Sequence, residues 1–430
     1  MKTREKAIVT LGRIFENEEF STEAIKHSVK GLDVRDQQFL RQLVYGVVEN
    51  KIYIDYIISN ASSIKLNKLN NEVLNSLRLG VYELYFLSSK NYAVINEIVN
   101  YVKKINFKSK NFVNAVLRNI DRDKGKFENL DKLSPDDYLS VKYSFNTDLV
   151  KYLINVYGNE NVEKVLENLN KKPIFSIRVD TNKISKNDLM YRLNRYGLEV
   201  THSEISRDCL IIKNPVNITE FKEFEEGYFT IQDQASILVS EILNPSENAK
   251  ILDLCAAPGS KSTHLAQISK DNSHIVSNDI SESKLYKIHD NFNRMKYKNY
   301  ETSAHDARNP NEKWVEGFDY ILVDAPCSGI GVIKRKPEIK INRSMNDIKE
   351  LAKIQEQILE NSYKYLKKGG YLVYSTCTVG EIENENNIEK FLKNHKDMEI
   401  LEQKGEKYLN ISLLDSDSDG FFICKMKKKL

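Results

Sequence analysis

Two cysteines follow apolar segments in a way that favours chemistry at the end of a strand. Tyr320-Ile-Leu-Val323 leads into Asp324-Ala-Pro-Cys327, and Tyr371-Leu-Val-Tyr374 leads into Ser375-Thr-Cys377. A thiolate is a good nucleophile, and the carboxyl ends of parallel strands open into one crevice. A single cysteine at a strand end is more often inert, by roughly five to one. Two thiols in such similar positions reverse these odds and indicate a catalytic pair.

The stretch Lys250-Ile-Leu-Asp-Leu-Cys-Ala-Ala-Pro-Gly-Ser-Lys261 predicts a buried strand, a tight turn and the start of a helix. Small residues let a ligand approach the backbone, and a helix N-terminus presents free N–H groups. The turn therefore predicts a cofactor pocket formed by Cys255, Ala256, Ala257, Pro258, Gly259, Ser260 and Lys261. A P-loop or a dinucleotide-binding turn would need glycines that are absent here, and an ordinary strand-to-helix turn remains the simplest alternative.

Acidic residues end two further segments of the same region. His274-Ile-Val-Ser-Asn278 leads into Asp279, and an acid at the tip of the second strand is a usual partner of a ribose hydroxyl pair. Asp306 follows a short third strand, and Asp324 ends the fourth. We expect the strands that begin at Ile251, Tyr320 and Tyr371 to share one edge, so that their ends form one crevice.

The motifs CAAPGSK, DAPCSG and STC, in this order and spacing, resemble the RNA cytosine-5 methyltransferases that use S-adenosylmethionine. The resemblance is to the bacterial 16S rRNA methyltransferase B group, also called Sun or Fmu. It extends through Arg335, Pro337 and Asp419-Gly-Phe-Phe422, and the whole chain length fits. Ser260 stands where the family usually has glycine. The implied fold is α/β, with a Rossmann-like methyltransferase domain after an all-α NusB-like domain and a small α+β module.

The resemblance also implies roles for the site residues. C5 of cytosine is a poor nucleophile, and adding a thiolate to C6 pushes electron density onto it. Cys377 would be that nucleophile, Cys327 would assist product release, and Asp324 would hydrogen-bond the cytosine. Asp306 would bind the adenine side of S-adenosylmethionine, Lys261 would lie near its methionine end or the target base, and Cys255 would only line the turn. The base must leave its stack, so single-stranded or loop RNA is expected.

Apolar positions keep helical spacing as far as about residue 128, so residues 1–128 are predicted to form an all-helical domain. The segment between Val99 and Ile120 carries five cations and no acid. We interpret this cluster as an RNA-binding face, although a solvated helix face is an equally common reason for such a run. Phe112-Val-Asn-Ala-Val-Leu-Arg118 resembles the NusB-like module, which favours RNA binding. The five cations are Lys103, Lys104, Lys108, Lys110 and Arg118.

Residues 129–234 combine helical spacing with short alternating segments, such as Ile174-Phe-Ser-Ile-Arg-Val179. This pattern predicts a small α+β module. The resemblance implies that the module contacts RNA, whereas the residues alone would equally allow a structural connector. Residues 235–430 then form the catalytic domain. After Cys327, the run Lys334, Arg335, Lys336, Lys340 and Arg343 surrounds a single Glu338, and it either borders the RNA backbone or forms a solvated loop.

Composition limits which partners, disulfide bonds and metal sites the chain is expected to have. The 430 residues include 64 basic and 61 acidic ones, so a net charge of +3 neither demands nor excludes nucleic acid. Five cysteines without C-x-x-C spacing oppose a disulfide framework or a zinc site. Asp415-Ser-Asp-Ser-Asp-Gly420 opens like a calcium loop, but its twelfth position is Met426, so we expect an acidic turn before a final strand and no metal.

The start, Met1-Lys-Thr-Arg-Glu5, lacks the apolar core of a signal peptide, and no run has the length of a membrane span, so we expect a cytoplasmic protein. We also expect a monomer. Its expected partner is 16S rRNA, either naked or in an early assembly intermediate. Three alternatives remain. The enzyme could methylate tRNA or another RNA, or it could be a Rossmann methyltransferase for DNA, protein or a small molecule. The chain could also be a noncatalytic NusB-like protein that binds RNA during transcription or assembly, although the cofactor turn and Cys377 oppose this.

Overall fold

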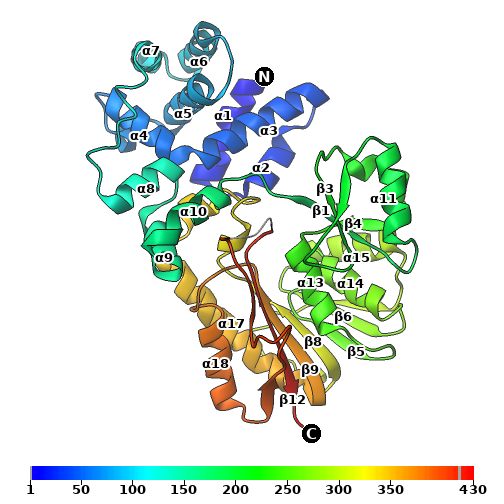
Figure 1. Ribbon diagram of the computed structural model, residues 1–430. Helices are drawn as coiled ribbons and strands as arrows, with labels where there is room; N and C mark the ends of the chain where they lie inside the picture. Colours follow the sequence, from blue (N-terminus) through cyan, green and yellow to red (C-terminus); the bar gives the residue numbers. More distant parts are fainter. Residues whose placement is uncertain (1, 415–417) are drawn as a thin grey trace. The chain divides into compact units, whose positions relative to one another are not determined.

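The computed structural model describes residues 2–414 and 418–430, and its contacts divide the chain into two compact units (Figure 1). The helical unit comprises Met1–Lys171 and Ile333–Met345, and the catalytic unit comprises Lys172–Val332 and Asn346–Leu430. The segment that follows the Cys327 loop therefore belongs to the helical unit. The sequence-based boundaries at residues 128 and 234 stay a prediction, and the acidic turn expected at 415–420 lies partly outside the described residues.

The helical unit forms because apolar side chains recur at helical spacing and pack into one core. Leu11, Leu43, Leu77 and Leu117 are each 0% exposed in it, as the sequence pattern predicts. Gly80 is needed for close helix packing, since a Cβ there would lie 2.9 Å from the Leu117 side chain. The helices are α1 (Thr3–Glu16), α2 (Ser21–Ser28), α3 (Val34–Glu49), α4 (Lys51–Ala61), η1 (Leu66–Lys68), α5 (Asn71–Phe86), α6 (Asn91–Ile105), η2 (Phe107–Ser109), α7 (Lys110–Arg122), α8 (Pro135–Tyr143), α9 (Thr147–Tyr157), α10 (Asn159–Leu169) and α16 (Ile339–Asn342).

The catalytic unit begins with a small antiparallel sheet in the order β2-β3-β1-β4. One face packs on α11 through residues such as Ile177, Leu189 and Leu210. Side chains alternate along a strand, so Ser176 and Arg178 of β1 point to the opposite face. The elements are β1 (Phe175–Val179), α11 (Lys186–Arg195), β2 (Val200–His202), β3 (Cys209–Ile212), η3 (Ile218–Glu220), α12 (Lys222–Glu225) and β4 (Phe229–Ile231).

The large sheet has the order β10-β12-β9-β8-β5-β6-β7, and β11 pairs with β12. The five strands β9, β8, β5, β6 and β7 are parallel, whereas β12 runs antiparallel to β9. The strands are β5 (Lys250–Asp253), β6 (His274–Asp279), β7 (Tyr300–Ala304), β8 (Phe318–Asp324), β9 (Leu366–Thr376), β10 (Met398–Ile400), β11 (Leu409–Ile411) and β12 (Phe421–Lys428). As expected from the sequence, the strands that carry Asp253, Asp324 and Thr376 are neighbours.

Helices cover both faces of this sheet (Figure 1). On one face, Leu265 and Phe292 pack against Ile251; on the other, Leu359 and Phe391 belong to the core that includes Leu252. This three-layer arrangement buries the central strands on both sides, as parallel strands require. The remaining elements are α13 (Gln234–Leu243), α14 (Ser260–Ile268), η4 (Glu282–Lys284), α15 (Leu285–Met295), η5 (Glu312–Trp314), η6 (Ile330–Val332), α17 (Met345–Tyr365) and α18 (Glu385–Asn394).

The predicted architecture is confirmed: an all-α region, a small α+β module and a Rossmann-like α/β fold follow each other along the chain. Among the helices formed by the described residues, none is long and apolar enough to cross a membrane.

Candidate active site

Cys327 and Cys377 lie side by side at the carboxyl ends of β8 and β9. The two strands pair in register through Asp324 and Ser375, so the loops that follow them leave the sheet together. The Cys327 Sγ and Cys377 Sγ atoms are 3.3 Å apart, and both residues are half-buried. The hydrogen bond with Cys377 and burial raise the pKa of Cys327 well above its usual range. The predicted pair of thiols is thus brought together in one place.

A buried network of hydrogen bonds lies behind the two thiols, and it was not predicted from the sequence. The hydroxyls of Ser328 and Thr378, the residues that follow the cysteines, are 2.6 Å apart. Glu383, which is 0% exposed, accepts hydrogen bonds from Ser328 N at 2.8 Å and from Gln355 Nε2 at 2.9 Å. The Gly331 N–H donates to the Cys377 carbonyl at 3.1 Å. These contacts tie the two loops together and fix the backbone on which each sulfur is carried.

Lys261 and Asp324 form an ion pair at the same edge of the sheet. Lys261 Nζ lies 2.6 Å from Asp324 Oδ2, and Ser375 Oγ donates to Asp324 Oδ1 at 2.8 Å. Burial opposes the charge of Lys261, but Asp324 and, less strongly, Cys377 outweigh it, so the pKa of Lys261 is raised. The sequence identified both ion-pair residues but did not predict their pairing. A positive charge next to Cys377 favours its thiolate form.

The predicted cofactor turn lies between β5 and α14. Gly259 adopts φ +98°, and a Cβ there would meet Ile288 Cα at 3.1 Å, so this position requires glycine for both reasons. The backbone N–H of Ala257 donates to Asp279 Oδ2 at 3.2 Å, and that of Ser281 donates to Asp279 Oδ1 at 3.0 Å. Each oxygen of Asp279 keeps a lone pair, so the carboxylate is oriented for two further donors, as a ribose diol would supply.

Four carboxylates converge on Cys255. Burial, followed by the charges of Asp253, Asp324, Asp279 and Asp306, raises the pKa of Cys255 well above its usual value. Asp253 itself is 1% exposed; burial raises its pKa to about 7, and it accepts a hydrogen bond from Ser262 Oγ at 2.6 Å. Such a group of acids suits a cofactor that carries positive charge, as the sulfonium of S-adenosylmethionine does, and repels phosphates. The residues present therefore fit this cofactor.

Asp306, like Asp324, is paired with a cation. Its side chain is 22% exposed and forms an ion pair with Arg308 at 2.6 Å. This hydrogen bond is the main reason why the pKa of Asp306 is lowered. The carboxylate therefore stays charged and keeps acceptor capacity for an amino group such as that of adenine.

Arg178 anchors the small sheet to the helix that follows the cofactor turn. Its side chain is 0% exposed; it donates to Gln232 Oε1 at 2.6 Å, to Thr263 Oγ1 at 2.9 Å and to the Ser260 carbonyl. Burial lowers the pKa of Arg178 to about 10, so the guanidinium remains charged near neutral pH. The sequence shows only an alternating strand here, and no local signal marks this contact between residues far apart in the chain.

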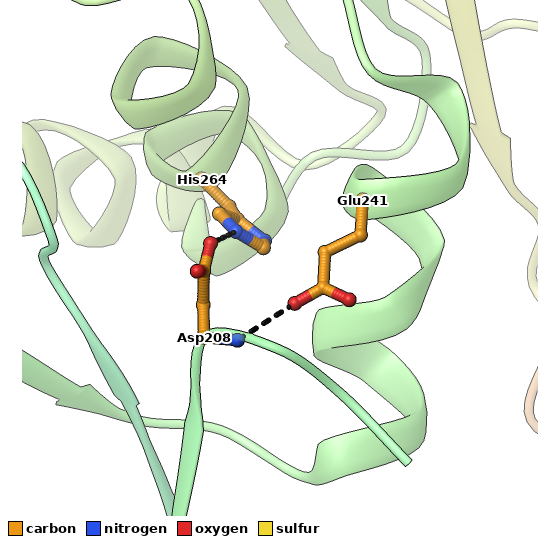
Figure 2. Close-up of side chains that lie close together, drawn as sticks. All are labelled: Asp208, Glu241 and His264. Atoms are coloured by element: carbon orange, nitrogen blue, oxygen red, sulfur yellow. Dashed lines mark hydrogen bonds and ion pairs between the residues drawn. The ribbon is translucent and has the colours of Figure 1, made fainter. Parts of the chain in front are cut away.

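Asp208, Glu241 and His264 form a cluster whose possible ligand atoms lie within 4.8 Å of one another (Figure 2). Protein groups already engage them: His264 Nε2 lies 3.1 Å from Asp208 Oδ2, and Glu241 Oε1 accepts from Asp208 N at 3.0 Å and Ser206 Oγ at 2.7 Å. Burial lowers the pKa of His264 to about 4, so the imidazole is neutral. We assign the cluster a structural role, in which it links the start of β3 to α13 and α14.

The cationic run after Cys327 does not form a continuous solvent-facing patch, so the expectation that Lys340 borders RNA was wrong. Lys340 is 2% exposed, and its Nζ donates to the Glu49 carbonyl and to Asn170 Oδ1, each at 2.7 Å. Glu338 is 5% exposed and accepts from Ser21 Oγ at 2.9 Å. Within the helical unit, these two residues therefore hold their segment in place.

The five cations between Val99 and Ile120 differ in their surroundings. Four of them are exposed, and the fifth, Lys110, lies over the ring of Phe107, which is itself 60% exposed, at 4.1 Å. Lys104 forms an ion pair with Glu5 at 2.6 Å. One of the five, Arg118, lines a cavity of about 630 Å³ together with Phe112 and Arg122, among others.

Family models match most of the chain. The model of the 16S rRNA methyltransferase RsmB/F matches residues 240–427, the NusB family model matches residues 1–122, and the RsmF/B-like ferredoxin-like domain matches residues 147–219. The three matches follow the order in which the helical domain, the small sheet and the large sheet occur in the chain.

Curated relatives match over nearly the full length. A probable ribosomal RNA small subunit methyltransferase B of Bacillus subtilis is 34% identical, covering 99% of this chain and 98% of the relative. The ribosomal RNA small subunit methyltransferase B of Proteus mirabilis is 32% identical, covering 93% and 92%.

Solved structures share the fold. PH0851 has a TM-score of 0.84 at 25% identity, covering 99% of this chain and 98% of its own. NSun6 from Pyrococcus horikoshii, solved with SFG, an analogue of S-adenosylmethionine, has a TM-score of 0.60 at 25% identity, covering 66% of this chain and 99% of its own. A methyltransferase homologue from Pyrococcus horikoshii is 30% identical with a TM-score of 0.62, covering 69% and 100%.

Proposed function

Since the chain belongs to the RsmB/F family of 16S rRNA methyltransferases, we propose that it methylates C5 of a specific cytosine in 16S rRNA through a covalent adduct between Cys377 and C6. The observation that carries this proposal is the pair of thiols 3.3 Å apart, beside the ion pair of Lys261 and Asp324. A methyltransferase that acts on an already nucleophilic atom needs no thiol, whereas C5 of cytosine does.

The cofactor is S-adenosylmethionine, which supplies an electrophilic methyl group when it is bound. Asp279 would hold the ribose hydroxyls with the two lone pairs that its backbone hydrogen bonds leave free. Asp306 would bind the adenine side, and the turn from Cys255 to Ser260 would line the pocket. Lys261 would lie between the methionine end and the target base, because its partner Asp324 belongs to the strand that leads to Cys327.

The chain's own residues would act on the cytosine in a fixed order. The Cys377 thiolate, stabilised by the nearby Lys261 charge, adds to C6 and makes C5 nucleophilic. Asp324, oriented by Ser375 and Lys261, accepts hydrogen bonds from the cytosine and stabilises the adduct. After methyl transfer, a base takes the C5 proton, the C5–H electron pair re-forms the C5–C6 double bond, and the Cys377 sulfur leaves C6 as a thiolate, which restores the aromatic ring. Cys327, held next to Cys377, would assist this release.

The helical unit would bind the RNA through the cations between Val99 and Ile120. Exposed lysines attract phosphates, and the exposed ring of Phe107 beside Lys110 offers a surface on which an unstacked base can lie. The small sheet of the catalytic unit would contribute a second surface. The small sheet borders a groove of about 810 Å³. The lining of this groove includes Lys172, Lys213, His202 and one acid, Glu204.

A covalent trap tests this function. If Cys327 releases the product, Cys327→Ala should let Cys377 attack and methylate and then stall as a protein–RNA adduct. Denaturing electrophoresis with labelled 16S rRNA would reveal the adduct, which should require the cofactor and should disappear in the Cys327→Ala, Cys377→Ala double variant. Cys424→Ala, which removes a fully buried thiol elsewhere in the sheet, is the matched control. Normal turnover by Cys327→Ala without a trapped species would refute the release role.

A further inference from the structure

The sulfur atoms of Cys327 and Cys377 are so close that a small side-chain movement would let them form a bond. Their sulfur atoms are 3.3 Å apart, whereas a disulfide needs about 2.05 Å. Side chains that already meet through their sulfur atoms need only a small change of χ1 to approach further. Reduced thiols at this distance are in van der Waals contact, so no other group lies between them.

The backbone around the pair cannot easily separate the sulfurs. The Ala325 N–H donates to the Ser375 carbonyl at 2.9 Å before the thiols, and the hydroxyls of Ser328 and Thr378 meet behind them. Glu383 accepts hydrogen bonds from both the backbone and the side chain of Ser328. Oxidation would therefore act on two sulfurs that are already held together, so disulfide formation would not carry the entropic cost of closing a long flexible loop.

We propose that Cys327 and Cys377 form a site of oxidative modification, at which hydrogen peroxide converts the two thiols into a disulfide. The Cys377 thiolate attacks one peroxide oxygen, the O–O bond breaks, and hydroxide leaves, which gives a sulfenic acid. The Cys327 sulfur then attacks the Cys377 sulfur, the S–O bond breaks, and the hydroxyl leaves with the Cys327 proton as water. Overall, two thiols lose two electrons and one peroxide becomes two waters.

The remaining cysteines are poorly suited to this chemistry. Cys209 and Cys424 are 0% exposed, and burial raises the pKa of Cys209 to about 12. Cys255 is half-buried, but burial and four carboxylates keep it protonated. The reaction is thus specific to one pair, and the disulfide would spare Cys377 from irreversible oxidation to a sulfinic acid.

Formation of the disulfide rests on the position of the two sulfurs and on the reactivity of the Cys377 thiolate, while the effect on activity rests on the proposed function. Because the bond would occupy both the nucleophile and the release thiol, methyl transfer should fall by at least about ten-fold. Dithiothreitol should restore it, since thiol exchange reopens a disulfide but not a sulfinic acid.

The full-length protein, without RNA or cofactor, is treated with about one equivalent of hydrogen peroxide, alkylated and digested for peptide mass mapping. We expect a peptide cross-linked between Cys327 and Cys377, and a fall in alkylatable thiols from five to three. In Cys327→Ala, dimedone should instead label Cys377 as a sulfenic acid. Sulfinic acid at Cys377 in the unmodified sequence, with no cross-linked peptide, would overturn the proposal. A disulfide that forms without loss of methyl transfer would support the modification site and refute the catalytic roles.

Discussion

Replacing Lys340 with methionine should remove a pH dependence from the stability of the helical unit. Lys340 is 2% exposed, and burial lowers its pKa from 10.5 to about 7. In the unfolded chain the same group keeps its ordinary pKa. Between these two values the unfolded state binds more protons than the folded state, so stability rises with pH. The cost of burying the charge is present in full below about pH 7 and is relieved above it.

The magnitude follows from the two pKa values. Between about pH 6.5 and pH 9, proton linkage at this one group increases the free energy of unfolding by roughly 2.5 kcal/mol. Lys340→Met also leaves the Glu49 carbonyl and Asn170 Oδ1 without their donor, which costs about 1–3 kcal/mol for each group. That loss is nearly independent of pH, so comparing two pH values separates it from the linkage.

Urea unfolding followed by far-ultraviolet circular dichroism, at both pH values, provides the measurement. The stability of the unmodified protein minus that of Lys340→Met should rise by about 2.5 kcal/mol from pH 6.5 to pH 9. Lys26→Met changes an exposed lysine of α2 in the same unit and should show no such rise. If the difference for Lys340→Met stays within about 0.5 kcal/mol of that control, Lys340 is not buried as a perturbed charge and the reasoning fails.

Three further variants test the proposed site. Cys377→Ala should abolish methylation yet leave S-adenosylmethionine affinity nearly unchanged in calorimetry, and substantial methyl transfer would reject the nucleophile. Asp279→Ala should weaken cofactor binding by about 1.5–3 kcal/mol, because it removes charge-assisted hydrogen bonds to the ribose, and an unchanged affinity would reject that role. Lys103→Glu with Lys108→Glu should lower RNA affinity and flatten its salt dependence without altering cofactor affinity, whereas an identical salt slope would place the RNA elsewhere.

The sequence predicted the large sheet and the strand ends well, because these depend on local patterns. Apolar runs that stop in small or polar residues marked Cys255, Asp279, Asp324 and Cys377 at strand ends before any contact was known. Parallel strands place such ends at one edge, so topology alone brought these residues close together. The roles of the individual residues remain predictions, since strand order fixes proximity but not chemistry.

Contacts between distant parts of the chain escaped prediction for a physical reason. Glu383 and Arg178 are buried polar groups, and each is tolerated only because partners from other segments satisfy it. No periodicity or spacing encodes those partners. Lys340 illustrates the opposite error, since a charge in a basic run is usually solvated. Its burial is explained by the carbonyl of Glu49, the side-chain oxygen of Asn170 and the ring of Phe145.

The group of acids around Cys255 distinguishes this turn from phosphate-binding turns more clearly than the missing glycines do. A helix N-terminus favours anions, and by itself it would suit a phosphate as well as a carboxylate. Here Asp253, Asp279, Asp306 and Asp324 all act on Cys255, and the only lysine of the turn, Lys261, is already paired with Asp324. A phosphate would meet this negative charge at close range, whereas a sulfonium with an α-ammonium group would reduce it. We therefore propose that the helix terminus takes the cofactor's carboxylate, while the acids take its positively charged groups.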